Sequence, residues 1–322
     1  MEPLVSINCI TFNHEAYLRS ALDGFLMQKT DFPFEILLHD DASTDKTPEI
    51  IREYAERYPD MIRPMYQTEN QYSKGISNIS GRFNFPRARG KYIAMCEGDD
   101  YWTDPDKLQM QVDYMEQHPD CALCFHSARV EVEDGSLTES RVRPYQGDRI
   151  VTPEEIIAKK SGYATASLLF PTEYVRQLPD YYVNCPVGDT PLQLLMATHG
   201  YGYYFDRDMC VYRVGVSVSW TTEGKKGNYV EKQKKYFAEM KASYQVFNRE
   251  TGGRFAPAVE EAVNRLYFLT MVNTRQYQEV LKPANRQFYQ ELTVRTRFFI
   301  RFEMTAPGLY RWLQNWLHRL RD

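Results

Sequence analysis

The sequence predicts an α/β fold with a mostly parallel central sheet flanked by helices, followed by a helical C-terminal region. Over residues 4–214, short β-rich apolar runs alternate with segments whose apolar residues have helical spacing, a pattern typical of parallel sheets. The run KYIAMC (91–96) is almost continuously apolar, as in strands that are buried on both faces. From about residue 225 onward, long helical patterns replace the strands. These three observations define the fold class.

The N-terminal part of the chain consists of repeated strand and helix patterns. The runs LVSINCITF (4–12) and FEILLHDD (34–41) predict the first two strands, and each precedes a helical pattern. The second helix has Pro48 near its start and Pro59 at its end, two positions where proline is common. The other elements that we expect are a strand at 61–66, a polar segment at 74–89, the strand at 91–96, a helix at 105–118 capped by Asp104, strands at 121–132 and 163–170, an irregular loop at 140–152, a helix after Asp189, and a strand that ends near residue 214.

Length, charge and cysteine content limit the class of protein. A chain of 322 residues with a formal net charge of -4 can bury one large core, and its charge gives no reason to expect a nucleic acid partner. The six cysteines lie mostly in apolar runs, as in a reducing compartment, and the C-x-x-C pair Cys121 and Cys124 has no second pair to complete a zinc site. The chain has no basic signal region and no run of about 18 apolar residues. We therefore expect a cytoplasmic protein without a membrane span.

Three acidic side chains follow the buried strand at 91–96. The stretch CEGDDYW places Glu97, Asp99 and Asp100 directly beyond the carboxyl end of that strand, where open α/β sheets bind their ligands. Adjacent carboxylates repel each other unless a cation or a hydrogen-bonding ligand occupies the site, although such residues also form turns. A magnesium-like ion bound by two carboxylates takes further ligands from phosphate oxygens and water. The pair Asp99 and Asp100 therefore predicts a metal-bound diphosphate.

Two further polar residues end strands at the same edge of the sheet. Asp41 follows the second predicted strand and is a candidate acceptor for a base N–H group, while Thr11 ends the first strand and flanks the same crevice. An Asx turn or a cap for the following helix explains Asp41 equally well. Neither G-x-G-x-x-G nor G-x-x-x-x-G-K-[ST] occurs in the chain, so nucleotide binding here would use side chains and a metal.

Four motifs, taken in order, closely resemble the family 2 glycosyltransferases of the GT-A fold: VSINCITFNHEAYLRSAL, EILLHDDASTDKT, RGKYIAMCEGDDYWTDPDKL and VGDTPLQLLMATHG. The resemblance covers roughly residues 4–220 and implies a catalytic domain at 1–220, with a helical region at 221–322. It implies transfer of a hexosyl or N-acetylhexosaminyl group from a nucleoside-diphosphate sugar to a hydroxyl group, with inversion at the anomeric carbon. By family frequency the donor is a UDP-sugar. The acceptor would be a glycan or a lipid-linked sugar in the synthesis of a bacterial surface polysaccharide.

The same resemblance implies roles for the residues of the nucleotide site. Asp41 would contact the nucleobase, in a pocket that Thr11 lines. Asp99 would contact the ribose or the metal-bound diphosphate, and Asp100 would bind the metal, Mn²⁺ or Mg²⁺. Asn78 lies in a polar segment that faces the nucleotide in relatives.

The resemblance also implies a catalytic base and raises a question about the metal. Asp189 would take the proton from the acceptor hydroxyl as that oxygen attacks the sugar, whereas a purely structural Asp189 would only cap its helix. In many relatives a histidine after the last strand completes the metal shell, but none occurs between His199 and His318. Two explanations stay open for the third ligand: water supplies it, or the metal is weakly held. Arg213 is a candidate contact of the diphosphate.

Two questions remain open from the sequence: whether the protein catalyses sugar transfer, and what its C-terminal helices contact. A non-catalytic protein that binds nucleotide sugars or carbohydrates on the same fold would also account for the missing histidine.

The helical pattern at 254–273 predicts packing on the catalytic domain or on a partner chain, as in a homodimer. The segment 294–322 mixes arginine with Phe, Trp and Leu, which is typical of a helix at an anionic membrane surface. A core-packed or dimer-forming helix would show the same pattern.

Overall fold

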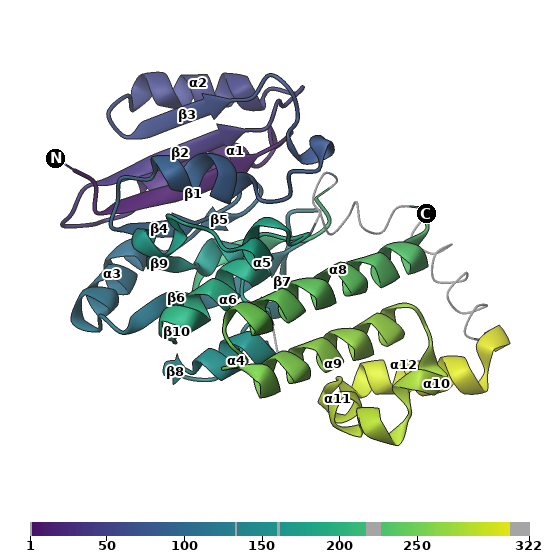
Figure 1. Ribbon diagram of the computed structural model, residues 1–322. Coiled ribbons are helices and arrows are strands. Elements are labelled where there is room, and N and C mark those ends of the chain that lie inside the picture. The colour runs from purple at the N-terminus through teal and green to yellow at the C-terminus, as the bar shows by residue number, and fades with distance from the viewer. Residues whose placement is uncertain (1, 133, 160–161, 217–226, 310–322) are drawn as a thin grey trace. The chain divides into compact units, whose positions relative to one another are not determined.

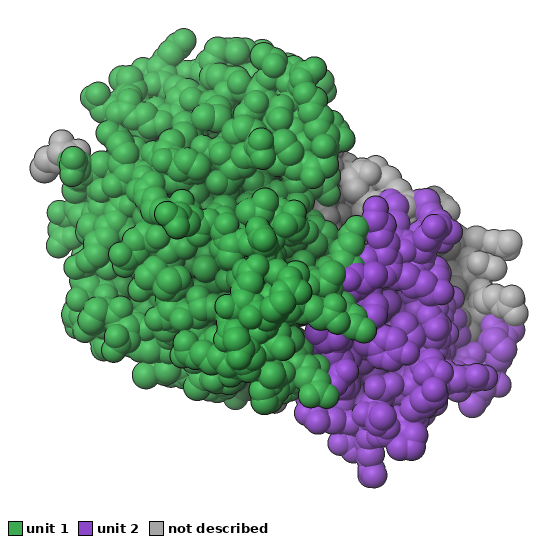
Figure 2. Space-filling model, in the orientation of Figure 1, with its two compact units in different colours: residues 1–226, 239–262 green, residues 227–238, 263–322 purple. Residues whose placement is uncertain are grey.

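The computed structural model describes residues 2–132, 134–159, 162–216 and 227–309. The chain forms two compact units (Figure 2), of which unit 1 consists of residues 1–226 and 239–262, and unit 2 of residues 227–238 and 263–322. Unit 1 contains the sheet, and unit 2 contains the last helices of the chain. The predicted end of the catalytic domain at residue 220 falls within 217–226, outside the described residues.

The described residues of unit 1 contain a ten-stranded sheet with the order β3-β2-β1-β4-β9-β6-β10-β5, in which β7 also pairs with β6 and β8 with β10 (Figure 1). In chain order the strands are β1 (Val5–Thr11), β2 (Phe34–Asp40), β3 (Ile62–Tyr66), β4 (Tyr92–Met95), β5 (Tyr101–Trp102), β6 (Cys121–Glu131), β7 (Leu137–Val142), β8 (Arg149–Val151), β9 (Leu169–Pro171) and β10 (Tyr201–Arg213). β1 pairs in parallel with β2 and β4, and β2 pairs in parallel with β3. The parallel N-terminal strands predicted from the sequence are therefore confirmed.

The other half of the sheet mixes strand directions. β9 lies antiparallel between β4 and β6, β10 is parallel to β6, and β5 and β8 pair antiparallel with β10. The prediction of an irregular loop at 140–152 is wrong, because β8 and the end of β7 lie within it. Most residues of these two strands are exposed, so their sequences lack the apolar alternation that marks a half-buried strand.

Two other predicted elements differ in detail. The strand predicted at 163–170 is the shorter β9, which follows a 3₁₀ turn at Thr165–Ser167. The predicted cap at Asp104 is wrong, because the helix α3 (Lys107–Gln117) begins later and has Asp106 at its N-cap position. Asp104 instead accepts a hydrogen bond from the Asp106 N–H at 3.0 Å and so forms an Asx turn before the helix.

The remaining helices of unit 1 flank the sheet. Leu18, Leu22 and Phe25 share one face of the first helix, and all three are buried in the same core as alternate residues of β1. Phe25 packs against Trp102 of β5, with 4.8 Å between ring centroids. These helices are α1 (Leu18–Leu26), α2 (Thr47–Arg57), α4 (Pro153–Ala158), α5 (Asp180–Val183) and α6 (Asp189–His199).

The six cysteines are free and buried. Cys121 and Cys124 lie in β6, which corresponds to the strand predicted at 121–132, with 3.8 Å between their sulfur atoms.

Unit 2 has a small apolar core of its own. Phe268 and Met271 of α9 pack with Val280, Tyr289 and Ile300. No helix within 2–132, 134–159, 162–216 and 227–309 is both long and apolar enough to span a bilayer. The C-terminal helices are α8 (Tyr229–Glu250) and α9 (Ala256–Asn273), which contribute to both units, and α10 (Tyr277–Val280), α11 (Arg286–Glu291) and α12 (Val294–Thr305).

Candidate active site

The acidic loop after β4 lies against the end of β1. The Cys96 N–H donates to the Asn8 carbonyl oxygen at 3.0 Å, and the Gly98 N–H donates to the Ile10 carbonyl oxygen at 3.0 Å. A Cβ atom on Gly98 would lie 2.7 Å from Cγ2 of Thr11, which is too close for any other residue without movement of the strand end. Glycine therefore allows the loop to approach β1, so Thr11 lies beside the acidic residues as the sequence predicts.

Asp99 and Asp100 are both buried, with exposed fractions of 8% and 3%. The backbone N–H of Arg213 donates to Oδ1 of Asp100 at 2.8 Å. Burial and the neighbouring Asp99 carboxylate raise the pKa of Asp100 well above its ordinary value. Burial, Asp99 and Asp189 likewise raise the pKa of Glu97 to about 8. Burial and mutual repulsion thus disfavour the ionised forms of these carboxyl groups, and a bound cation would favour them.

Arg213, at the end of β10, holds the acidic loop in place. Its Nη1 donates to the carbonyl oxygen of Asp99 at 2.9 Å, and its Nε donates to Oε1 of Glu131 at 2.6 Å. The guanidinium carbon lies 4.3 Å from the ring centroid of Tyr101 and 5.2 Å from that of Tyr17. These contacts position the backbone of Asp99. A contact of Arg213 with a diphosphate stays a prediction.

Asp189 is the first residue of α6 and has a cationic partner. Nζ of Lys159 lies 3.1 Å from Oδ2 of Asp189 and 3.1 Å from Oγ1 of Thr190. Burial opposes ionisation of Asp189, but the Lys159 ammonium outweighs it and lowers the pKa of the carboxyl below its ordinary value. The Asp189 side chain is 34% exposed. Asp189 is therefore an ionised carboxylate that is partly exposed to solvent, and its negative charge contributes to the raised pKa of Glu97 in the acidic loop.

Asp41 is buried at the end of β2 and holds the following loop. Its Oδ1 accepts from the N–H of Gln71 at 2.8 Å, and its Oδ2 accepts from the N–H of Tyr72 at 3.0 Å. Its own N–H donates to the Thr11 carbonyl oxygen at 3.0 Å, which joins the ends of β1 and β2. Each carboxylate oxygen can accept a further bond, so contact of Asp41 with a nucleobase stays a prediction beside this structural role.

Asn78 is buried and lies two residues before the short π-helix at Ser80–Asn84. Its Oδ1 accepts from the Gly81 N–H at 3.0 Å. This bond gives Asn78 a local structural role, and the predicted approach to a nucleotide is untested.

His14 lies next to the acidic loop. Its Nε2 is 4.0 Å from Oδ2 of Asp99, and burial lowers the pKa of the imidazole, so the ring is neutral at pH 7. Sequence patterns predict neither contact, because the first motif includes His14 without assigning it a role and none of the four motifs includes Lys159.

The donor atoms at this edge fit a hard divalent cation. Among the described residues, no group of three or more His, Cys, Asp or Glu side chains is arranged to hold a metal. The buried carboxylates of Asp99 and Asp100 would instead supply two oxygen ligands, and Mg²⁺ or Mn²⁺ would take its other ligands from phosphate oxygens and water. The segment 217–226, which follows β10 closely in the chain, lies outside the described residues.

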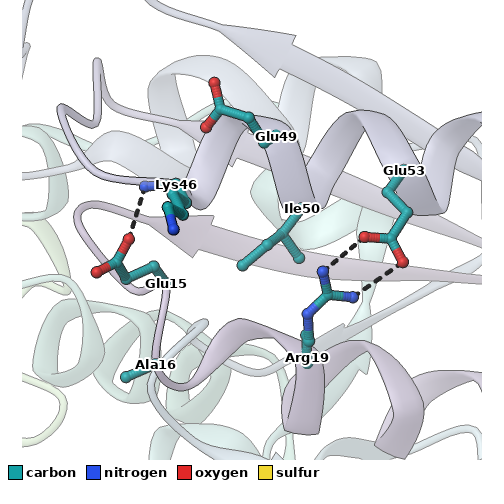
Figure 3. A pocket seen from close by; sticks show the side chains of 7 residues that line it. All are labelled: Glu15, Ala16, Arg19, Lys46, Glu49, Ile50 and Glu53. Atoms are coloured by element: carbon teal, nitrogen blue, oxygen red, sulfur yellow. Dashed lines mark hydrogen bonds and ion pairs between the residues drawn. The ribbon is translucent and has the colours of Figure 1, made fainter.

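A groove of about 380 Å³ between α1 and α2 is distinct from this edge (Figure 3). Three of its charged side chains are already bonded within it: Arg19 forms a bidentate pair with Glu53 at 3.0 and 2.6 Å, and Glu15 accepts from the Lys46 backbone N–H at 2.9 Å. The residues that line it include none of the predicted site residues; they are Glu15, Ala16, Arg19, Lys46, Glu49, Ile50 and Glu53.

Two adjacent carboxylates at the carboxyl edge of a flanked α/β sheet, with a separate ionised carboxylate near them, define a GT-A fold protein of the glycosyltransferase class. The chain belongs to the family 2 glycosyltransferases, since the sequence model described as "Glycosyl transferase family 2" matches residues 6–166, half of the 322 residues.

Similar proteins come from bacteria and archaea. An uncharacterized protein of Mycobacterium tuberculosis is 46% identical over 159 residues, which are 48% of this chain and 43% of the relative. A Bacillus subtilis protein whose name assigns it provisionally to teichuronic acid biosynthesis is 30% identical over 42% of this chain and 50% of its own length. An uncharacterized glycosyltransferase of Methanocaldococcus jannaschii is 29% identical, over 60% of this chain and 68% of the relative. The match thus spans half or less of the first two relatives.

Solved structures share the fold at low sequence identity. Mannosyltransferase PcManGT from Pyrobaculum calidifontis, in complex with GDP-Man and Mn²⁺, has a TM-score of 0.57 at 17% identity, with 98% of this chain and 84% of that chain covered. TarS 1–349 of S. aureus, in complex with UDP-GlcNAc, has a TM-score of 0.52 at 13% identity, with 95% and 88% covered. Both are consistent with the GT-A fold of this chain.

Proposed function

We propose that this protein is a metal-dependent inverting glycosyltransferase that moves a sugar from a nucleoside-diphosphate sugar to a hydroxyl group of an acceptor. The observation that carries the proposal is the pair of buried carboxylates Asp99 and Asp100, on one sheet edge with the ionised carboxylate of Asp189. A non-catalytic protein that binds nucleotide sugars would need Asp99 and Asp100 to hold the metal and diphosphate, but it would have no use for the ionised carboxylate of Asp189.

In the proposed reaction, the acceptor oxygen forms a bond to the anomeric carbon of the sugar while the bond from that carbon to the diphosphate oxygen breaks. Asp189 takes the proton of the acceptor hydroxyl, and the nucleoside diphosphate leaves with the bonding electron pair. Attack from the face opposite the diphosphate inverts the anomeric configuration. Asp99 and Asp100 would hold Mn²⁺ or Mg²⁺, which stabilises negative charge on the leaving diphosphate when bound.

We assign the nucleotide to the edge formed by the ends of β1, β2 and β4. Asp41 would accept a bond from a nucleobase N–H, Thr11 would line the base pocket and Asn78 would face the nucleotide, while Asp99 contacts the ribose or the diphosphate. UDP is the nucleotide that we propose, and the fold neighbour TarS is known in complexes with UDP and UDP-GlcNAc. The transferred group would be a hexosyl or an N-acetylhexosaminyl group.

We propose a glycan or a lipid-linked sugar as the acceptor, in bacterial surface polysaccharide synthesis at the cytoplasmic side of the membrane. The B. subtilis relative with a name from teichuronic acid biosynthesis supports this setting.

A thermal-shift screen of nucleoside-diphosphate sugars, each with and without Mn²⁺, tests donor binding. A donor at 100 times its Kd stabilises the folded protein by about 2.7 kcal/mol, and we expect this stabilisation only with the metal present. The best donor is then incubated with candidate acceptors, and the release of nucleoside diphosphate is measured. Stabilisation without any transfer would favour the non-catalytic alternative, and no stabilisation by any donor would contradict the proposal.

The helix α12 supports a membrane-surface role for unit 2. Ile300 lies in the core of unit 2, whereas Val294 and Phe298 are 75% and 62% exposed, and Arg295 and Arg301 are exposed as well. Aromatic and basic side chains on one helix suit an anionic lipid surface. Residues 310–322 of the predicted segment lie outside the described residues.

Vesicle sedimentation tests the membrane role of α12. The double substitution Phe298→Ser and Arg301→Ser is expected to lower partition onto vesicles with anionic lipid severalfold, and the wild-type protein is expected not to partition onto neutral vesicles. Unchanged partition would contradict this role. Light scattering of both proteins would show whether the same helix forms a homodimer instead.

A further inference from the structure

We propose that Lys159 is a positioning residue for Asp189, which keeps the carboxylate charged and fixes its orientation toward the acceptor hydroxyl. This inference rests on the proposed glycosyl transfer, because it gives Lys159 a part in preparing the base of that reaction.

The first argument is the geometry of three contacting side chains. One ammonium group, Nζ of Lys159, lies 3.1 Å from both Oδ2 of Asp189 and Oγ1 of Thr190, and the Thr190 hydroxyl lies 3.4 Å from Oδ1 of Asp189. Both carboxylate oxygens are therefore engaged, so rotation of the carboxylate group is restricted. Each oxygen has a second lone pair, which leaves room for the proton of an acceptor hydroxyl.

The second argument is the backbone conformation of Lys159. It follows α4 as the C-cap residue, with φ of 43° and ψ of 66°, in the left-handed region. Glycine is the residue that normally occupies such a position, because it has no Cβ to crowd the backbone. A lysine at a helix end usually extends into water, but this side chain is only 20% exposed. The contacts of the ammonium group with Asp189 and Thr190 best explain why a lysine occupies this unfavourable backbone conformation.

The third argument is the charge around Asp189. Four described groups interact electrostatically with it: Lys159 after α4, Glu97 after β4, Tyr182 in α5 and Cys185 after α5. Of these four, Lys159 is the cation, and Glu97 carries negative charge whenever it is ionised. Without the ammonium, burial would favour the protonated form of Asp189, which cannot accept a proton, and Glu97 would add to this effect once it is ionised.

The test compares Lys159→Gly with Lys159→Arg. Glycine removes the ammonium and also suits the left-handed backbone, so this variant is expected to fold, whereas arginine keeps the positive charge. Lys91→Met is the matched control, because Lys91 forms an exposed ion pair with Glu116 at 2.7 Å away from Asp189.

The first measurement is the titration of Asp189 by NMR in protein labelled with ¹³C at the aspartate carboxyl carbons. The signal of Asp189 is identified by its absence in Asp189→Asn. In Lys159→Gly we expect the pKa of Asp189 to rise by about one pH unit, and in Lys159→Arg and Lys91→Met to stay near the wild-type value. This readout does not require sugar transfer, so it remains valid if the proposed function fails.

The second measurement is the pH profile of kcat/KM for transfer. Sugar transfer needs the ionised carboxylate of Asp189, so a raised pKa of Asp189 in Lys159→Gly moves the acidic limb of the profile to higher pH. In Lys159→Arg the acidic limb is expected at the wild-type pH. The KM for the donor is expected to stay unchanged. An unchanged Asp189 titration in Lys159→Gly would overturn the inference, and so would a shifted titration with an unmoved acidic limb. If the wild-type protein itself transfers no sugar, this result would count against the proposed function and not against the effect of Lys159 on Asp189.

Discussion

Replacing Asp189 by asparagine is expected to lower the rate of sugar transfer by about 100- to 10,000-fold. Asparagine has nearly the same size and can still accept a hydrogen bond from Lys159, but its amide cannot take the proton of an acceptor hydroxyl. The measurement is kcat at saturating donor. Because Asp189 is not among the residues that we assign to the nucleotide, the thermal shift produced by the donor should stay unchanged.

Two observations separate a lost base from a damaged fold. Lys159 and Asp189 are both partly exposed, so loss of their ion pair should change the free energy of unfolding by about 1 kcal/mol or less. Asp180→Asn is a matched control, since Asp180 is an exposed aspartate at the start of the neighbouring helix α5. Its transfer rate should stay within about twofold of wild type. An Asp189→Asn protein that transfers sugar at the wild-type rate would remove Asp189 from the mechanism.

The parallel part of the fold could be predicted because its strands are buried on both faces. β1, β2 and β4 appear in the sequence as β-rich or apolar runs that lead directly into polar residues. Burial favours such runs wherever helices cover both faces of a sheet. The exposed strands β7 and β8 could not be predicted, because most of their residues face water and show no apolar alternation. In addition, β8 pairs with β10, which lies much further along the chain, whereas β7 pairs with the preceding strand β6.

The position of the acidic residues could also be predicted from strand ends. Parallel strands bring their carboxyl ends to one edge, so Thr11, Asp41 and Asp99 fall together without any knowledge of side-chain contacts. The roles of Asp41 as nucleobase contact and of Asp189 as base came from the family resemblance and await their experiments.

The contacts that support the acidic loop could not be predicted. Arg213 reaches Asp100 across 113 positions of the chain, and Lys159 reaches Asp189 across 30. Both contacts depend on how β10, α4 and α6 pack, and packing leaves no fixed spacing in the sequence. His14 approaches Asp99 only because Gly98 lets the loop lie against β1.

Replacing Asp100 by asparagine is expected to have two opposite effects, a more stable metal-free protein and a loss of metal-dependent donor binding. Asparagine has the same shape and its Oδ1 can keep the bond from the Arg213 N–H, so the loop should retain its structure. It carries no charge, so the repulsion with Asp99 and the cost of burying a second carboxylate disappear. Without a carboxylate at position 100, the metal loses one of its two protein ligands.

The stability effect has a defined pH dependence. The folded protein raises the pKa of Asp100, so folding favours the protonated form. Asp100 therefore makes its full contribution to the free energy of unfolding of the wild-type protein at pH below about 4, the ordinary pKa of an aspartate in the unfolded chain. That contribution is lost as the pH rises toward the raised pKa of the folded state. The increase in the free energy of unfolding that Asp100→Asn produces in the metal-free protein should accordingly be near zero at pH 4 and on the order of 2 kcal/mol at pH 8.

Thermal unfolding in EDTA and in Mn²⁺, over this pH range, measures both effects. In EDTA the variant should unfold at a higher temperature than wild type at pH 8, whereas in Mn²⁺ with donor the wild type should become the more stable protein. The exposed Asp113 of α3 provides the control, since Asp113→Asn should change neither result. A variant that is less stable than wild type in EDTA at pH 8 would mean that the two carboxylates are not in repulsion, and the argument for a cation at Asp99 and Asp100 would fail with it.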